Sequence, residues 1–242
     1  MRVSHGRRRN APHGRSSVDI LTWLRAKYEE EVDFNKRSPI ELPNAGRDTL
    51  ARWFYVWGFT RGAEIGVERG MYSEVLCRAN PNLSLYGIDS WAPYSHYRDH
   101  VSAPKLEGFY QEAAQRLAPY HATLLRKFSV DAARDFKDGE LDFVYLDGNH
   151  ALEHVIADLA AWTPKIRPGG IIAGHDYSRY KLPNQIHVVQ AVTAWTSAKE
   201  ISPWFLLGSQ AKDETHPRDA ARSWCWVQPE PVRVSIRRPI KQ

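Results

Sequence analysis

A glycine turn between a short apolar run and a helical pattern constrains this chain most. The run at residues 63–65 carries the carboxylate of Glu64 and leads into Gly66 and Gly70, after which apolar positions recur at helical spacing. A second apolar run ends in Asp89. A glycine turn lets the backbone approach a ligand closely, and an acid at the end of the next strand can hold a ribose diol. The pattern predicts an adenosine-bearing cofactor across the carboxyl edge of a parallel sheet.

Units of strand followed by helix repeat along the chain. The strands are predicted at 63–66, 83–89, 122–128, 141–146 and 171–173, and the helices between and after them at 72–79, 106–118, 152–162 and 188–198. Two further strands, 204–207 and 224–227, have no helix between them and should be antiparallel neighbours. The fold class is therefore α/β: a doubly wound, Rossmann-like sheet, mostly parallel with one antiparallel strand near the C-terminus, and helices on both faces.

The length of 242 residues fits one such domain, predicted at residues 18–228. It begins with helices near 18–32 and 44–57, the first opened by Ser17, and carries a lid-like insert at about 91–118. The net charge of +5 lies in a basic arm, residues 1–17, and a basic tail, residues 229–242, so that the body carries a charge of about −3. We expect the arm to be disordered, and charge confined to tails is weak support for a nucleic-acid enzyme.

Two cysteines, Cys77 and Cys225, are too few and too unpatterned for a disulfide framework or a zinc site, and we expect buried thiols. No run of eighteen apolar residues exists, and the Arg-rich start lacks the apolar core of a signal peptide. These features predict a cytoplasmic protein without a membrane partner.

Polar side chains follow the predicted strands closely. They are Glu64, Asp89, Ser129, Asp131, Asp147, His150, His175 and Asp176. Ligands of an open parallel sheet bind outside the carboxyl ends of its strands, so we expect these residues to share one edge. A single acid at such a point is often a helix cap, and for Asp131 both interpretations stay open. Glu64, buried in a central strand, must find donors, and a ligand ammonium group is one natural partner.

Asp147 and Asp176 end adjacent predicted strands. Two close carboxylates repel each other unless a cation lies between them, and oxygen ligands suit Mg²⁺ or a similar divalent ion. The alternative is that one acid is protonated or bonded to backbone amides; we favour the metal. His150 is then a candidate general base for a hydroxyl proton, with His175 as its competitor for that role or as a metal ligand.

Four segments carry a family resemblance: EIGVERGMYSEVL at 64–76, GIDSW at 87–91, LDFVYLDGNH at 141–150 and WTPKIRPGGIIAGHDY at 162–177. With them the chain resembles the class I S-adenosylmethionine-dependent methyltransferases. It is most similar to the small-molecule O-methyltransferase branch that includes the macrocin and mycinamicin sugar methyltransferases. The resemblance implies methyl transfer from S-adenosyl-L-methionine to a hydroxyl of a small molecule, with a sugar or a phenol as acceptor.

The resemblance also implies roles for individual residues. Cofactor binding falls to Glu64, Gly66, Gly70, Ser73, Asp89, Ser129, Asp131 and Asp147, with Asp89 on the ribose and 129–131 at the adenine edge. Metal binding falls to Asp147, His175 and Asp176, where His175 replaces an acid that many relatives carry. His150 and Asp147 form the catalytic pair. For an O-methyltransferase, the aromatic residues of the insert, Trp91, Tyr94, Tyr97 and Tyr110, could form a lid over the acceptor; the alternative is a hydrophobic insert packed on the sheet.

Three other functions were weighed. A nicotinamide-dependent dehydrogenase requires G-x-G-x-x-G, which the spacing of Gly62, Gly66 and Gly70 does not supply. A nucleic-acid methyltransferase often carries Asn/Asp-Pro-Pro-aromatic after the fourth strand, and residues 147–150 read DGNH instead. A non-catalytic adenosine-cofactor module that uses the basic arm would have no need of the acids and histidines. The expected partner is a small-molecule hydroxyl acceptor, nucleic acid is disfavoured, and a homo-oligomer is left open.

Overall fold

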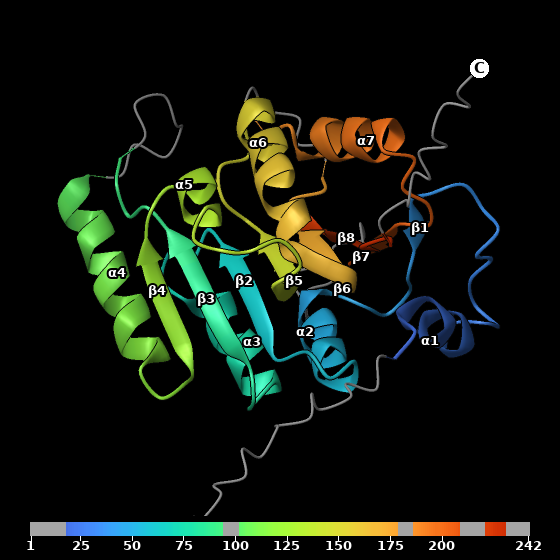
Figure 1. The fold of residues 1–242 in the computed structure, drawn as a ribbon, viewed down its shortest axis with the longest axis horizontal. Coiled ribbons are helices and arrows are strands. Elements are labelled where there is room, and N and C mark those ends of the chain that lie inside the picture. Colours follow the sequence, from blue (N-terminus) through green and yellow to red (C-terminus); the bar gives the residue numbers. More distant parts are fainter. Residues whose placement is uncertain (1–17, 94–101, 179–185, 209–220, 231–242) are drawn as a thin grey trace, which may run out of the picture.

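The computed structural model describes residues 18–93, 102–178, 186–208 and 221–230. The predicted basic arm at 1–17 and residues 231–242 of the basic tail lie outside these ranges. One eight-stranded sheet runs through the molecule in the order β1-β7-β8-β6-β5-β2-β3-β4 (Figure 1).

The sheet is parallel except for one strand. The strands are β1 (Ile40–Glu41), β2 (Arg61–Ile65), β3 (Ser84–Asp89), β4 (Ala122–Arg126), β5 (Leu141–Leu146), β6 (Ile166–Gly174), β7 (Phe205–Leu207) and β8 (Ser223–Val227). Only β8 runs antiparallel to its neighbours, β6 and β7. This confirms the predicted mostly parallel, Rossmann-like sheet with one antiparallel strand near the C-terminus.

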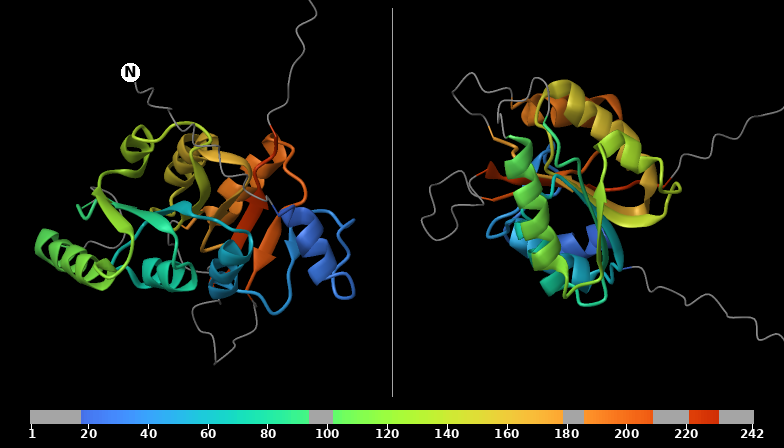
Figure 2. Two further views of the ribbon diagram at one scale, coloured as in Figure 1. Left: turned by 60° about the horizontal axis from the view of Figure 1, so that its bottom comes forward. Right: turned by 90° about the vertical axis from the view of Figure 1, so that its left-hand side faces the viewer.

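Helices cover both faces of the sheet, and Figure 2 shows the blue helices on one side and the yellow and orange helices on the other. The first face carries α1 (Ile20–Lys27), α2 (Arg47–Val56) and α3 (Met71–Ala79). The second carries α5 (Ser129–Ala133), α6 (Leu152–Trp162) and α7 (Val188–Ala198), while α4 (Ala103–Leu117) lies beside β4. The 3₁₀ turn η1 (Thr163–Lys165) leads from α6 into β6.

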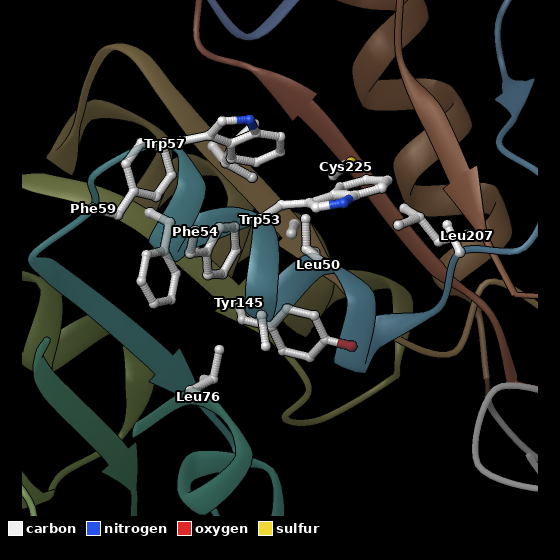
Figure 3. Close-up of a cluster of buried hydrophobic side chains, with 14 of the residues drawn as sticks. Leu50, Trp53, Phe54, Trp57, Phe59, Leu76, Tyr145, Leu207 and Cys225 are labelled. Atoms are coloured by element: carbon white, nitrogen blue, oxygen red, sulfur yellow. The ribbon is translucent and has the colours of Figure 1, made fainter. Parts of the chain in front are cut away.

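Strand β5 shows how the two layers are encoded. Its alternate residues Phe143 and Tyr145 face the core under α1–α3, and Val144 and Leu146 face the core under α5–α7. All four are buried, because a parallel strand covered on both faces has no solvent side. Figure 3 shows part of the first core, including Trp53 and Phe54 of α2. The Phe54 ring stacks on that of Phe143, with ring centroids 4.1 Å apart.

Three local expectations differ from the structure. Helix α1 is capped by Asp19, whose carboxylate accepts a hydrogen bond from the Thr22 amide, and it ends at Lys27, well before residue 32. Strand β1 was not predicted, because two residues carry no periodicity and the strand forms by pairing with β7. Strand β6 begins at Ile166 and so includes the residues predicted to form a turn. The strand continues through them because Gly169 adopts a φ of 71° and the pairing with β5 shifts in register.

The expectation of buried thiols is confirmed. Both cysteines are buried and free, and burial raises the pKa of each thiol to about 12. Within the described part of the chain, no helix combines the length and apolar character needed to cross a bilayer.

Candidate active site

A cavity of about 1110 Å³ opens at the carboxyl edge of the sheet. Its walls come from the ends of β2, β3 and β5, from residues 127–130 after β4, and from helices α2, α3, α4 and α6. Of the residues predicted from the sequence, those that line it are Glu64, Gly66, Asp89, Ser129, Asp147 and His150. The sheet thus brings strand ends that are far apart in sequence around a single space.

Asp89 holds two of the loops that form the cavity. One carboxylate oxygen accepts the amides of Val67 and Glu68 at 3.1 and 2.9 Å, and the other accepts the amide of Trp91 at 2.9 Å. Gly66 adopts a φ of 89°, and a side chain there would collide with the Asp147 carbonyl. The glycine is therefore required both by its backbone conformation and by the close approach of the loop after β5.

Glu64 lies beneath this loop and is 1% exposed. The hydroxyl of Ser73 donates a hydrogen bond to its carboxylate. Burial raises the pKa of Glu64 to about 8; the charges of Asp147 and Asp89 also raise it, while Ser73 and the guanidinium of Arg47 lower it. Ser73 thus lies behind Glu64, and Gly70, at a φ of 73°, begins α3. Neither Ser73 nor Gly70 is part of the cavity wall.

The two remaining cofactor-binding candidates, Ser129 and Asp131, both follow β4 but differ in their position relative to the cavity. Ser129 lines the cavity, and its hydroxyl accepts the indole N–H of Trp162 at 2.8 Å. Asp131 is not part of the cavity wall; its carboxylate pairs with Arg134 at 2.8 Å on the surface of α5. Asp131 lies in the first turn of α5, whose N-cap is Phe128, so the structure places it as a surface acid that neither caps the helix nor lines the cavity.

The candidate metal and base residues form one cluster. The Nε2 atom of His150 lies 3.1 Å from a carboxylate oxygen of Asp176 and 3.6 Å from one of Asp147. The Nδ1 atom of His175 lies 3.4 and 3.7 Å from the same two oxygens. Asp147 and His150 line the cavity, whereas His175 and Asp176 lie behind them.

This cluster fits a divalent metal ion. Asp147, His175 and Asp176 each offer one ligand atom, and these atoms lie within 4.8 Å of one another. The Nε2 atom of His175 is buried without a hydrogen-bond partner. Burial lowers the pKa of His175, but the hydrogen bond to Asp176 and the charges of Asp147 and Asp176 outweigh it, so that the pKa is raised. Two carboxylate oxygens and one imidazole nitrogen are a donor set that hard and borderline divalent ions accept.

Two cavity residues were missed by sequence reasoning. Arg47, the first residue of α2, places its guanidinium 3.9 Å from the Asp147 carboxylate and 4.9 Å from the ring centre of Tyr72. Asp158 of α6 is 6% exposed; burial raises its pKa to about 6, although a hydrogen bond from Ser129 lowers it. Asp158 left a signal, because it is an acid on the buried face of an amphipathic helix. The sequence around Arg47 contains no such signal.

The predicted aromatic cover is described in part. Trp91 is buried, lines the cavity and packs edge-to-face on Tyr110 at 5.0 Å. Its indole N–H donates to the carbonyl of Glu68 at 2.8 Å, so the ring also fixes the glycine loop. Tyr94 and Tyr97 lie outside the described residues.

Comparison with solved structures shows the same fold at low sequence identity. The O-methyltransferase TomG of Streptomyces achromogenes, solved with SAM, aligns over 90% of this chain and 93% of its own, at 15% identity and a TM-score of 0.55. An O-methyltransferase of Bacillus cereus in complex with SAH aligns over 86% and 88%, at 14% identity and a TM-score of 0.54. A putative caffeoyl-CoA O-methyltransferase of Staphylococcus aureus aligns over 89% and 94%, at 15% identity and a TM-score of 0.53.

Two sequence comparisons match part of the chain. An uncharacterised protein of Sinorhizobium fredii is 28% identical over 127 residues, which are 48% of this chain and only 13% of that much longer protein. Residues 63–177 match the family model described as a methyltransferase domain. This segment holds every residue that the sequence predicted for the site. The match to a methyltransferase domain thus covers the strands that end at the cavity, and the solved methyltransferases share the fold of this chain.

Proposed function

We propose that the protein transfers a methyl group from S-adenosylmethionine to a hydroxyl of a small molecule, a sugar or a phenol, with His150 as base and a divalent metal ion. The observation that carries this proposal is the position of the acid–histidine cluster. Asp147 and His150 line the same cavity as Glu64 and Asp89. A proton acceptor therefore lies beside the residues that would hold the cofactor.

The cofactor would lie along the ends of β2, β3 and β4. Asp89 would accept a hydrogen bond from a ribose hydroxyl at Oδ1, which accepts only the Trp91 amide and keeps a second lone pair, whereas Oδ2 already accepts two amides. Ser129 and Asp158 lie beyond it, where the adenine would reach α6. The cofactor supplies an electrophilic methyl group, and the cavity residues hold it in line with the acceptor.

His150 is the better candidate for the base. Its ring lines the cavity, whereas His175 lies behind Asp147. The carboxylate of Asp176, at 3.1 Å, orients the imidazole. An imidazole held in this way takes the hydroxyl proton as the methyl group is transferred. Its second partner, Asp147 at 3.6 Å, stabilises the resulting charge.

Asp147, His175 and Asp176 would hold the metal ion. Bound there, it supplies Lewis acidity that lowers the pKa of the acceptor hydroxyl. The cavity volume of about 1110 Å³ leaves room for an acceptor beside the cofactor, and its wall includes the apolar surfaces of Trp91, Leu106 and Phe109. Such surfaces suit the faces of a sugar or a phenol.

The test is methyl transfer from labelled S-adenosylmethionine to a panel of sugars and phenols, with and without a chelator. The Asp147→Asn and His150→Gln variants should each lose about 100-fold or more in turnover, the usual contribution of a general base, and bind S-adenosylhomocysteine like the wild type. Chelation should stop turnover, and added Mg²⁺ should restore it. Asp131→Asn is the matched control, because it removes one carboxylate charge outside the cavity.

Two results would contradict this proposal. Full turnover by Asp147→Asn in the presence of chelator would remove the metal from the mechanism. Transfer to amines or nucleic acid, with none to hydroxyls, would replace O-methylation by the nucleic-acid-associated or N-directed alternative.

A further inference from the structure

We propose that Arg47 binds the carboxylate at the amino-acid end of the cofactor, so that the N-terminal helix α2 completes the cofactor site. This inference rests on the assignment of S-adenosylmethionine as cofactor but on neither the acceptor nor the metal. Arg47 lies outside the segment 63–177 that matches the methyltransferase family. The residue is thus an addition to the site by this chain's own N-terminal region.

The guanidinium of Arg47 is largely buried, and its ion pair with Asp147 is long, at 3.9 Å. The side chain is 12% exposed and lines the cavity, and its Nε atom has no hydrogen-bond partner. The carboxylate of Asp147, at 3.9 Å, is beyond hydrogen-bond distance. A buried guanidinium that is not fully hydrogen-bonded is costly, and a planar carboxylate is the group that its fork of donors matches.

Tyr72 fixes the position of Arg47. Its backbone carbonyl accepts the hydroxyl of Tyr72 at 2.8 Å, while its guanidinium lies over the ring of the same tyrosine at 4.9 Å. Tyr72 belongs to α3, the helix that follows the glycine loop. The loop that receives the cofactor and the cation of α2 are therefore held together by one side chain.

The charges around the cavity indicate which carboxylate Arg47 would bind. The amino-acid end of the cofactor carries an ammonium and a carboxylate on one carbon, so its site needs an acid and a cation close together. Arg47 is near enough to Glu64 to lower the pKa of that acid. Among the described residues of the cavity wall, the other lysine or arginine is Lys127, which follows β4 and pairs with Asp135 at 2.6 Å.

The same arrangement meets an electrostatic requirement. Asp89 and Asp147 make this side of the cavity acidic, which favours the sulfonium and ammonium groups and disfavours the carboxylate of the same ligand. Arg47 offsets that repulsion at the point where the ligand's own negative charge would lie.

The experiment compares two ligands that differ in the amino-acid end. S-adenosylhomocysteine carries it and 5′-methylthioadenosine lacks it, and both are titrated calorimetrically into the full chain. Arg47→Gln should weaken S-adenosylhomocysteine about 10- to 100-fold, as expected for a lost charge-assisted contact, and change 5′-methylthioadenosine less than threefold. Arg47→Lys keeps the charge but loses the fork, and should give an intermediate loss. Arg52→Gln, on the exposed part of the same helix, should change neither affinity.

A decarboxylated analogue of S-adenosylhomocysteine separates the two charges of the ligand. It keeps the amine, so its affinity should fall in the wild type and should be insensitive to Arg47→Gln. This comparison in the wild type also tests the proposal should Arg47→Gln fail to fold, a point checked by thermal unfolding without ligand.

Equal losses for both ligands would show that Arg47 only supports the fold and would overturn the proposal. Unchanged binding of S-adenosylhomocysteine, together with a raised KM for the acceptor, would assign Arg47 to the acceptor instead. A wild type that binds neither ligand would contradict the methyltransferase function itself, which is a different result.

Discussion

An aspartate lies at each end of strand β5, and the two have opposite environments. Asp142, near the start of the strand, accepts the amides of Thr60 and Arg61 at 2.7 and 2.9 Å and the guanidinium of Arg167 at 2.7 Å. Asp147, just beyond its end, has its ion-pair partners Arg47, His150 and His175 at 3.6–3.9 Å. The Asp142 side chain is 1% exposed and that of Asp147 is 20% exposed.

The contrast separates an acid that stabilises the sheet at its amino edge from an acid that faces the cavity at its carboxyl edge. At the amino edge of the sheet, the acid satisfies backbone groups of β2 and pairs with β6, so it ties three strands together. At the carboxyl edge, the acid faces a cavity and is held at longer range among histidines and an arginine. The same residue type thus ties strands together at one end of β5 and lines a cavity at the other.

The largest expected effect is on stability, from Asp142→Ala. It would leave two backbone amides and the Arg167 guanidinium without their shared acceptor, at a cost of about 3–5 kcal/mol in the free energy of unfolding. The matched change at the other end, Asp147→Ala, should cost less than about 1 kcal/mol, as for a more exposed acid with longer contacts. Urea unfolding of both variants measures the difference, and equal losses would break the comparison.

The second-largest expected effect is on cofactor binding. The test compares Asp89, which ends β3, with Asp131, which follows the neighbouring strand β4. Asp89→Ala should weaken S-adenosylhomocysteine about 100-fold, because the change removes the ribose acceptor and releases the amides of both loops. Asp131→Ala should leave the affinity unchanged, since Asp131 pairs with Arg134 outside the cavity. Calorimetric titration of S-adenosylhomocysteine into each variant measures the two affinities. A strong effect of Asp131→Ala would show that the adenine edge reaches α5 in the bound state.

The smallest effect is a pH dependence caused by Glu64. Its pKa rises from 4.5 to about 8 on folding, so the folded state binds the proton more tightly. This stabilisation is fully present below about pH 4.5 and is lost as the pH rises through 8. Between pH 7 and 8.5 the wild type should lose about 1 kcal/mol more than Glu64→Gln, which has no proton to lose. Urea midpoints at several pH values measure this, and parallel pH profiles would contradict a buried, protonated Glu64.

Much of the site could be predicted from the sequence because strand ends are local features. The acids of Glu64, Asp89 and Asp147 each close an apolar run, and the topology of a parallel sheet brings such ends to one edge. Strand periodicity likewise sufficed for β5 and the antiparallel β8. The same reasoning could not separate Ser129 from Asp131, two residues apart, because which of them faces the cavity depends on how α5 packs.

The sequence by itself determined most of the strands and helices (β1 and α5 excepted), the glycine turn and the acids that follow the strands, because periodicity and turn chemistry act over a few residues. The tertiary structure decided which side chains meet. It brought Arg47 of α2 next to Asp147, placed Asp158 of α6 against Ser129, and gathered His150 and His175 around two carboxylates. Such contacts join segments about 20 to 100 residues apart, and they form only when both faces of the sheet are covered and the helices are fixed in place.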